Sequence, residues 1–63
     1  MNDEEEKYYV CIGMEKYGGG FMQKLGRALG HADSINTAKI KQMWLDDWKK
    51  YLEFGLKSEE GKK

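Results

Sequence analysis

The sequence contains no proline and only one cysteine, Cys11, among its 63 residues. Without a second cysteine the chain cannot form an internal disulfide, which is a common source of stability in small domains. Cys11 and the only histidine, His31, supply two of the four nitrogen or sulfur ligands that a structural zinc site uses. We therefore expect no disulfide, no zinc site and no cofactor.

An excess of charge of one sign is also lacking, because 11 basic and 11 acidic residues give a formal net charge of zero. This balance argues against general nucleic-acid binding, which normally needs a basic surface. No apolar run approaches the roughly 18 residues of a membrane-spanning helix. The acidic start, "MNDEEEKYY", does not have the features of a secretory signal. Together with the lone cysteine, these features predict a cytoplasmic protein without membrane contact.

The pattern that is present predicts an all-α fold, a small bundle of three short helices in one domain over residues 1–55. The first helix is expected from about Asp3 to Tyr17, because the acidic residues that open it favour a helix N-terminus. Its middle, "YYVCIGM", would suit a strand equally well. A strand that pairs with another molecule is therefore the alternative for residues 7–17.

The second helix is predicted from Phe21 to Ala32, where apolar residues recur at helical spacing. Gly26 and Gly30 are costly inside a helix, by roughly 1 kcal/mol each relative to alanine. Their spacing of four places both on one side of the helix, where a neighbouring helix could approach closely.

The third helix is predicted to begin at an N-cap, either Asp33 or Ser34, and to end near Gly55 as a C′ glycine. Asp46 and Asp47 could cap a new helix after Trp44, so a fourth helix following a kink is the alternative. The charged residues 56–63 are predicted to form a disordered tail.

The stretch "YGGGFMQKLG" has the glycine content of a phosphate-binding loop but not its spacing. Such a loop places lysine directly after its last glycine and a hydroxyl residue next, whereas Lys24 follows Gly20 by four positions. The glycines are instead interpreted as helix boundaries, with Gly18 ending one helix in the left-handed conformation and Gly20 starting the next.

The sequence offers no recognisable catalytic set, so we predict that the protein is not an enzyme. His31 has no serine, cysteine or carboxylate placed by sequence to act with it. Cys11, between apolar neighbours, is interpreted as a small buried hydrophobic residue.

Aromatic residues are numerous, with two tryptophans, four tyrosines and two phenylalanines. A domain of this size cannot easily bury all eight, so some are expected at an interface. For the stripe Trp44, Trp48 and Tyr51 we favour a position in the core. The alternative is that these residues, with Phe54, form an interaction surface, since tryptophan and tyrosine are frequent anchors in protein interfaces.

The stretch "LGRALGHADSINTAKIKQMW" has the outline of a helix-turn-helix, with Arg27, Lys39 and Lys41 as candidate DNA contacts. Two features oppose this interpretation. His31 stands where an apolar residue normally follows the turn glycine, and the zero net charge does not favour DNA binding.

Residues 17–51 resemble a group of short, uncharacterised open reading frames of bacteriophages, prophages and related mobile elements. The resemblance runs over these residues: Tyr17, Gly18, Gly19, Phe21, Leu25, Ala28, Ala32, Asp33, Asn36, Lys39, Ile40, Trp44, Trp48 and Tyr51. Members of that group often have proline at the position of Leu45, which implies a helix break after Trp44. The resemblance implies a phage or mobile-element setting and assigns no catalytic or ligand-binding residue.

The resulting functional hypothesis is a small accessory protein that binds a host or phage macromolecule, most readily a protein. Counter-defence or host takeover is its most concrete version and follows from the resemblance alone. One alternative is a helix-turn-helix DNA-binding protein. The other is a self-assembling oligomer with a structural or ligand-sequestering role.

Overall fold

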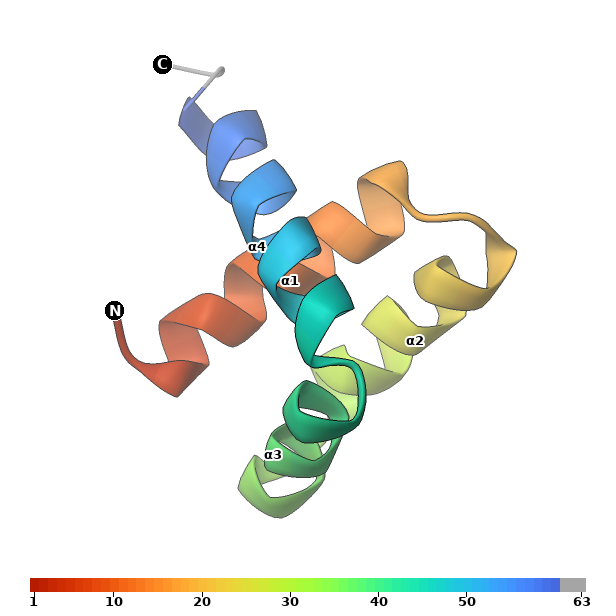
Figure 1. The fold of residues 1–63 in the computed structure, drawn as a ribbon, viewed down its shortest axis with the longest axis vertical. Helices are drawn as coiled ribbons and strands as arrows, with labels where there is room; N and C mark the ends of the chain where they lie inside the picture. The colour runs from red at the N-terminus through yellow and green to blue at the C-terminus, as the bar shows by residue number, and fades with distance from the viewer. Residues whose placement is uncertain (61–63) are drawn as a thin grey trace.

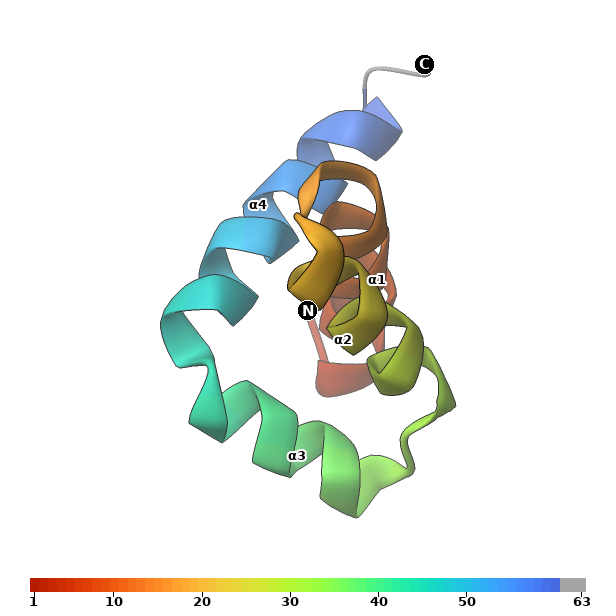
Figure 2. The same ribbon diagram turned by 90° about the vertical axis from the view of Figure 1, so that its right-hand side faces the viewer.

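The computed structural model describes residues 1–60, and these form four α-helices, which confirms the predicted all-α bundle (Figure 1). The helices are α1 (Asp3–Tyr17), α2 (Gly20–His31), α3 (Ser34–Met43) and α4 (Leu45–Glu60). α1 is the centre of the arrangement, since both α2 and α4 pack extensively against it. α3 makes far fewer contacts and runs across one end of the molecule from α2 to α4 (Figure 2).

Local capping explains where α1 begins. The Asn2 side chain accepts a hydrogen bond from the Glu5 backbone N–H, and the Glu5 carboxylate accepts one from the Asn2 N–H, at 2.9 and 3.3 Å. This reciprocal capping box satisfies two backbone donors that a helix N-terminus otherwise leaves without partners. Residues 7–17 continue the same helix, so the alternative of a strand for this segment is wrong.

The predicted third helix is divided in two, as the alternative expectation allowed. Asp33 is the N-cap of α3, because its side chain accepts a hydrogen bond of 2.8 Å from the Asn36 N–H. Trp44 leaves helical geometry, with φ −121° and ψ 54°, and α4 starts at the next residue. Asp46 and Asp47 lie within the first turn of α4, where their charges favour the helix dipole.

α1 and α4 cross at two glycines that occupy equivalent positions on the two helices. A Cβ atom on Gly13 of α1 would overlap the Tyr51 carbonyl of α4, and one on Gly55 would overlap the Tyr9 carbonyl of α1. Each helix therefore presents a tyrosine followed four residues later by a glycine, and each glycine receives the backbone of the other helix's tyrosine. Only a residue without a side chain permits this approach.

Two predicted roles of glycine are therefore wrong. Gly55 is buried in the helix crossing and does not end α4, which continues to Glu60. Residues 56–60 of the predicted disordered tail are helical, and 61–63 lie outside the described residues. Gly18 does end α1, but at φ −78° and ψ 158°, in extended rather than left-handed conformation. The prediction that α2 starts at Gly20 is confirmed.

The core lies where α1, α2 and α4 meet. It consists of five buried side chains: Val10, Met14, Leu29, Trp48 and Tyr51. Gly26 brings α2 close to α1, because a Cβ there would lie 2.8 Å from that of Met14. The expected close approach of a neighbouring helix is thus found at Gly26 but not at Gly30, where a Cβ would meet nothing within 4 Å.

The glycine crossing can be tested by adding one methyl group to each helix. We expect Gly13→Ala and Gly55→Ala each to lower the free energy of unfolding by about 2 kcal/mol or more, because backbone atoms cannot move aside as side chains can. Urea denaturation followed by tryptophan fluorescence measures the change. Gly20→Ala is the matched control, since a Cβ there meets open space. Unchanged stability of the two core variants would contradict the crossing.

Candidate functional site

A polar cluster joins α1, α3 and α4, and the carboxylate of Glu6 is its centre. The Trp48 indole N–H donates a hydrogen bond of 2.9 Å to Glu6 Oε1, and Lys41 Nζ lies 3.0 Å from the same oxygen. Lys41 also donates to Asp3 Oδ1 at 3.3 Å and lies over the Trp48 ring, 5.6 Å from its centroid. The cluster holds α3, which has few other contacts, to the rest of the bundle.

The contacts in the cluster shift the pKa values of Glu6 and Lys41. The hydrogen bond from Trp48, followed by that from Lys41, lowers the pKa of Glu6 below its ordinary value of 4.5. The hydrogen bond to Glu6 raises the pKa of Lys41. Both shifts favour the charged forms, so Glu6 and Lys41 are ionised near neutral pH.

The lowered pKa of Glu6 predicts how acid affects stability. The stabilisation is complete above pH 4.5, the ordinary pKa, and is lost as the pH falls through the lowered value. Glu6→Gln should lower the free energy of unfolding at pH 7 by about 1 kcal/mol and weaken its dependence on acid. Denaturation at a series of pH values measures both effects. Glu4→Gln is the control, and equal acid dependence in wild type and Glu6→Gln would contradict this role.

The residues predicted as an aromatic interaction surface are mostly internal. Trp48 and Tyr51 are 1% and 6% exposed, so these two belong to the core, as the favoured interpretation held, and do not form a surface. Trp44 and Phe54 are half-buried. The reason is the helix crossing, which turns one face of α4 directly onto α1.

The candidate DNA contacts do not come together as one basic face. Lys39 and Lys41 are two residues apart on α3, so they project from nearly opposite sides of that helix. Lys41 points inward to Glu6, while Lys39 is exposed. Arg27, on α2, lies 3.8 Å from Glu15 of α1 in an exposed ion pair.

Large apolar side chains are instead exposed around the turn between α3 and α4. Met43, Leu45 and Phe21 are 73%, 42% and 62% exposed. Phe21 comes from the start of α2 and contacts half-buried Trp44, with ring centroids 6.0 Å apart. We call these four residues the junction patch. Sequence reasoning missed the junction patch because Phe21 and Met43 each fall on the apolar face of a predicted helix. Those faces were expected to point into the core.

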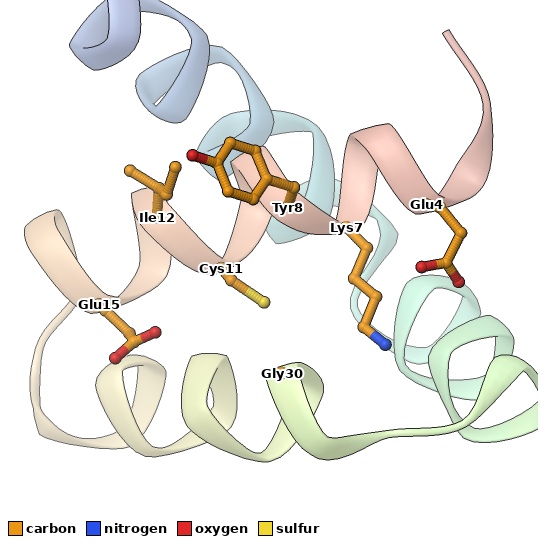
Figure 3. A pocket seen from close by; sticks show the side chains of 7 residues that line it. All are labelled: Glu4, Lys7, Tyr8, Cys11, Ile12, Glu15 and Gly30. Carbon is orange, nitrogen blue, oxygen red and sulfur yellow. The ribbon is translucent and has the colours of Figure 1, made fainter.

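A second surface feature is an open groove between α1 and α2, with a volume of about 430 Å³ (Figure 3). Its lining residues are Glu4, Lys7, Tyr8, Cys11, Ile12, Glu15 and Gly30. All except Gly30 come from α1. Lys7 reaches across to α2, where its ammonium donates a hydrogen bond of 2.7 Å to the carbonyl of Ala32 at the C-cap of that helix.

Cys11 lies in the floor of this groove and is half-buried rather than fully enclosed. Burial raises the pKa of its thiol to about 11, with a smaller contribution from the negative charge of Glu15. Because the thiolate is the nucleophilic form of cysteine, Cys11 is an apolar wall of the groove and a poor nucleophile near neutral pH.

The raised pKa predicts slow alkylation of Cys11. At pH 8 we expect iodoacetamide to modify the folded protein at least about tenfold more slowly than the protein in urea, because the thiolate is scarce. The rate should rise as the pH approaches 11. Mass spectrometry over time measures the modification. Equal rates for the folded and unfolded chain at pH 8 would show that the thiol is not protected.

The part of the chain that the structure describes contains no group of three or more histidine, cysteine, aspartate or glutamate side chains placed to hold a metal ion. None of its helices combines the length and apolar character needed to cross a membrane. Comparison of the chain with protein-family models, curated proteins and solved structures gave no match.

Proposed function

We propose that this protein acts by binding another protein, and that the junction patch of Phe21, Met43, Trp44 and Leu45 is the binding surface. The supporting observation is the exposure of its methionine, leucine and phenylalanine side chains. Clusters of exposed apolar residues are uncommon on monomeric proteins and typically mark interaction sites. Aromatic residues and methionine are also the types enriched where protein interfaces bury them.

The shape of the molecule at this point supports the proposal. The patch spans the start of α2 and the break between α3 and α4, so its residues come from separate parts of the chain. Trp44 is held by its contact with Phe21 and by its place at the break, where its carbonyl accepts a hydrogen bond of 2.8 Å from the Trp48 N–H. A pre-ordered apolar surface costs less conformational entropy on binding than a flexible one.

The proposed setting is a phage or mobile-element accessory protein whose partner is a host or phage protein. This part of the proposal rests on the resemblance described above. Counter-defence or host takeover is the corresponding biological role, and co-expression with candidate host defence systems would test it.

The binding surface is tested by exchanging its two aliphatic side chains for serine. We expect Met43→Ser/Leu45→Ser to weaken capture of the partner from bacterial lysate by roughly a hundredfold, as expected when two buried interface anchors are removed. Immobilised wild-type and variant chains are compared by quantitative mass spectrometry. Gln23→Ser/Lys24→Ser, at exposed positions of α2, is the control.

The same variants, with two further measurements, separate the alternatives. A partner captured equally by all three proteins would contradict the junction patch. A wild-type dimer that becomes monomeric in Met43→Ser/Leu45→Ser, measured by light scattering, would favour the self-assembling oligomer. Binding to duplex DNA that falls steeply with salt and with Lys39→Glu would favour the helix-turn-helix alternative.

A further inference from the structure

The groove between α1 and α2 lies on a different part of the surface from the junction patch. Tyr9 and Gly13 of α1 face α4, whereas Lys7, Cys11 and Glu15 point toward α2 and line the groove (Figure 3). Tyr8 and Ile12 also line it but project from α1 on the side away from α2 (Figure 3). Nothing in the core or in the polar cluster requires this groove.

The groove exists because α2 touches α1 at one turn and diverges from it at the next. At Gly26 a Cβ would lie 2.8 Å from that of Met14, which is closer than van der Waals contact. One turn later, at Gly30, a Cβ would meet nothing within 4 Å. The fold therefore explains glycine at position 26 but gives no packing reason for glycine at position 30. Any larger side chain at Gly30 would project into the groove.

The lining residues of α1 form a stripe along its surface. Glu4, Tyr8 and Ile12 recur every four residues, and Glu15 follows three later. From residue 4 to residue 15 such a stripe extends roughly 16 Å, about three turns of helix. Its centre is apolar, with Tyr8 57% exposed and Ile12 half-buried. Both ends carry a carboxylate.

The carboxylate of Glu4 differs from its neighbours in the first turn of α1. Asp3 and Glu6 bind Lys41, and Glu5 completes the capping box with Asn2. Within the part of the chain that the structure describes, Glu4 takes part in no side-chain hydrogen bond or ion pair. The positive charge nearest in the groove lining, that of Lys7, is directed to the Ala32 carbonyl of α2.

From this charge pattern we infer that the groove binds a basic amphipathic helix of a partner protein. An apolar side chain of that helix fits over Gly30 beside Cys11, with Tyr8 at the outer edge of the groove, and an arginine or lysine one or two turns away pairs with Glu4. An amphipathic helix laid in an apolar groove is a common form of peptide recognition. The open, elongated shape and the acidic end of this groove match such a segment better than a small enclosed ligand.

The test uses a displayed library of helical peptides, selected on the immobilised full-length chain. We expect the enriched peptides to carry leucine, phenylalanine or tryptophan with arginine or lysine one or two turns away. Gly30→Leu should weaken their binding by roughly tenfold or more, because the new side chain occupies the groove, and Glu4→Lys should do the same by repulsion. Fluorescence anisotropy of a synthetic copy of the best peptide measures both effects.

Matched controls separate the groove from general effects. Gly20→Leu makes the same exchange at another open glycine, and Glu53→Lys makes the same charge reversal on α4, so both should bind the peptide as wild type does. Thermal unfolding checks that Gly30→Leu folds. Tyr8→Ala, at an exposed position, is a second groove variant and should also weaken binding.

Three outcomes would overturn the inference: no enriched peptide, enriched peptides that are acidic or neutral, or undiminished binding to Gly30→Leu and Tyr8→Ala. A wild-type dimer that Gly30→Leu converts to a monomer would instead identify the occupant as a second copy of this chain. Met43→Ser/Leu45→Ser should bind the peptide normally. A wrong groove proposal would therefore be revealed by Gly30→Leu and Tyr8→Ala. A wrong junction-patch proposal would be revealed by Met43→Ser/Leu45→Ser.

Discussion

The close crossing of α1 and α4 is the contact on which the rest of the structure depends. Gly13 and Gly55 each receive a tyrosine carbonyl of the opposite helix, which no residue with a side chain would allow. Because α1 and α4 lie so close together, Trp48 is buried against α1 and its indole N–H donates a hydrogen bond to Glu6. Glu6 in turn holds Lys41 of α3. One backbone contact thus sets the positions of the core and of the polar cluster.

The way in which α3 is attached explains why apolar side chains remain outside. α1, α2 and α4 bury a shared core, whereas α3 spans the end of the molecule and is attached through the charged contacts of Lys41 and the packing of Ile40 against that core (Figure 2). Ile40 packs against the core, but the apolar residues that follow it at the end of α3 are not enclosed. Met43 and Leu45 consequently face solvent at the break that joins α3 to α4.

Local sequence signals were sufficient to predict the helices and most of their boundaries. The N-cap of α3, predicted as either Asp33 or Ser34 and found at Asp33, and the start of α2 at Gly20 both depend on residues close in sequence. Gly55 was misinterpreted as a helix end because its role depends on Tyr9, more than forty positions away. α4 continues past this contact through residues 56–60, which were predicted as part of a disordered tail. The presence of glycine in a sequence does not by itself indicate whether a helix ends there or packs closely against another helix.

The candidate surfaces were less predictable than the fold, for a related reason. Amphipathic spacing correctly favoured the core for Trp48 and Tyr51, but it could not reveal that the helix breaks at Trp44 and turns Met43 outward. The groove depends on where two helices diverge, and no local pattern contains that information. Gly26 and Gly30 look equivalent in the sequence. Only the angle between α1 and α2 makes the first a packing contact and the second an opening.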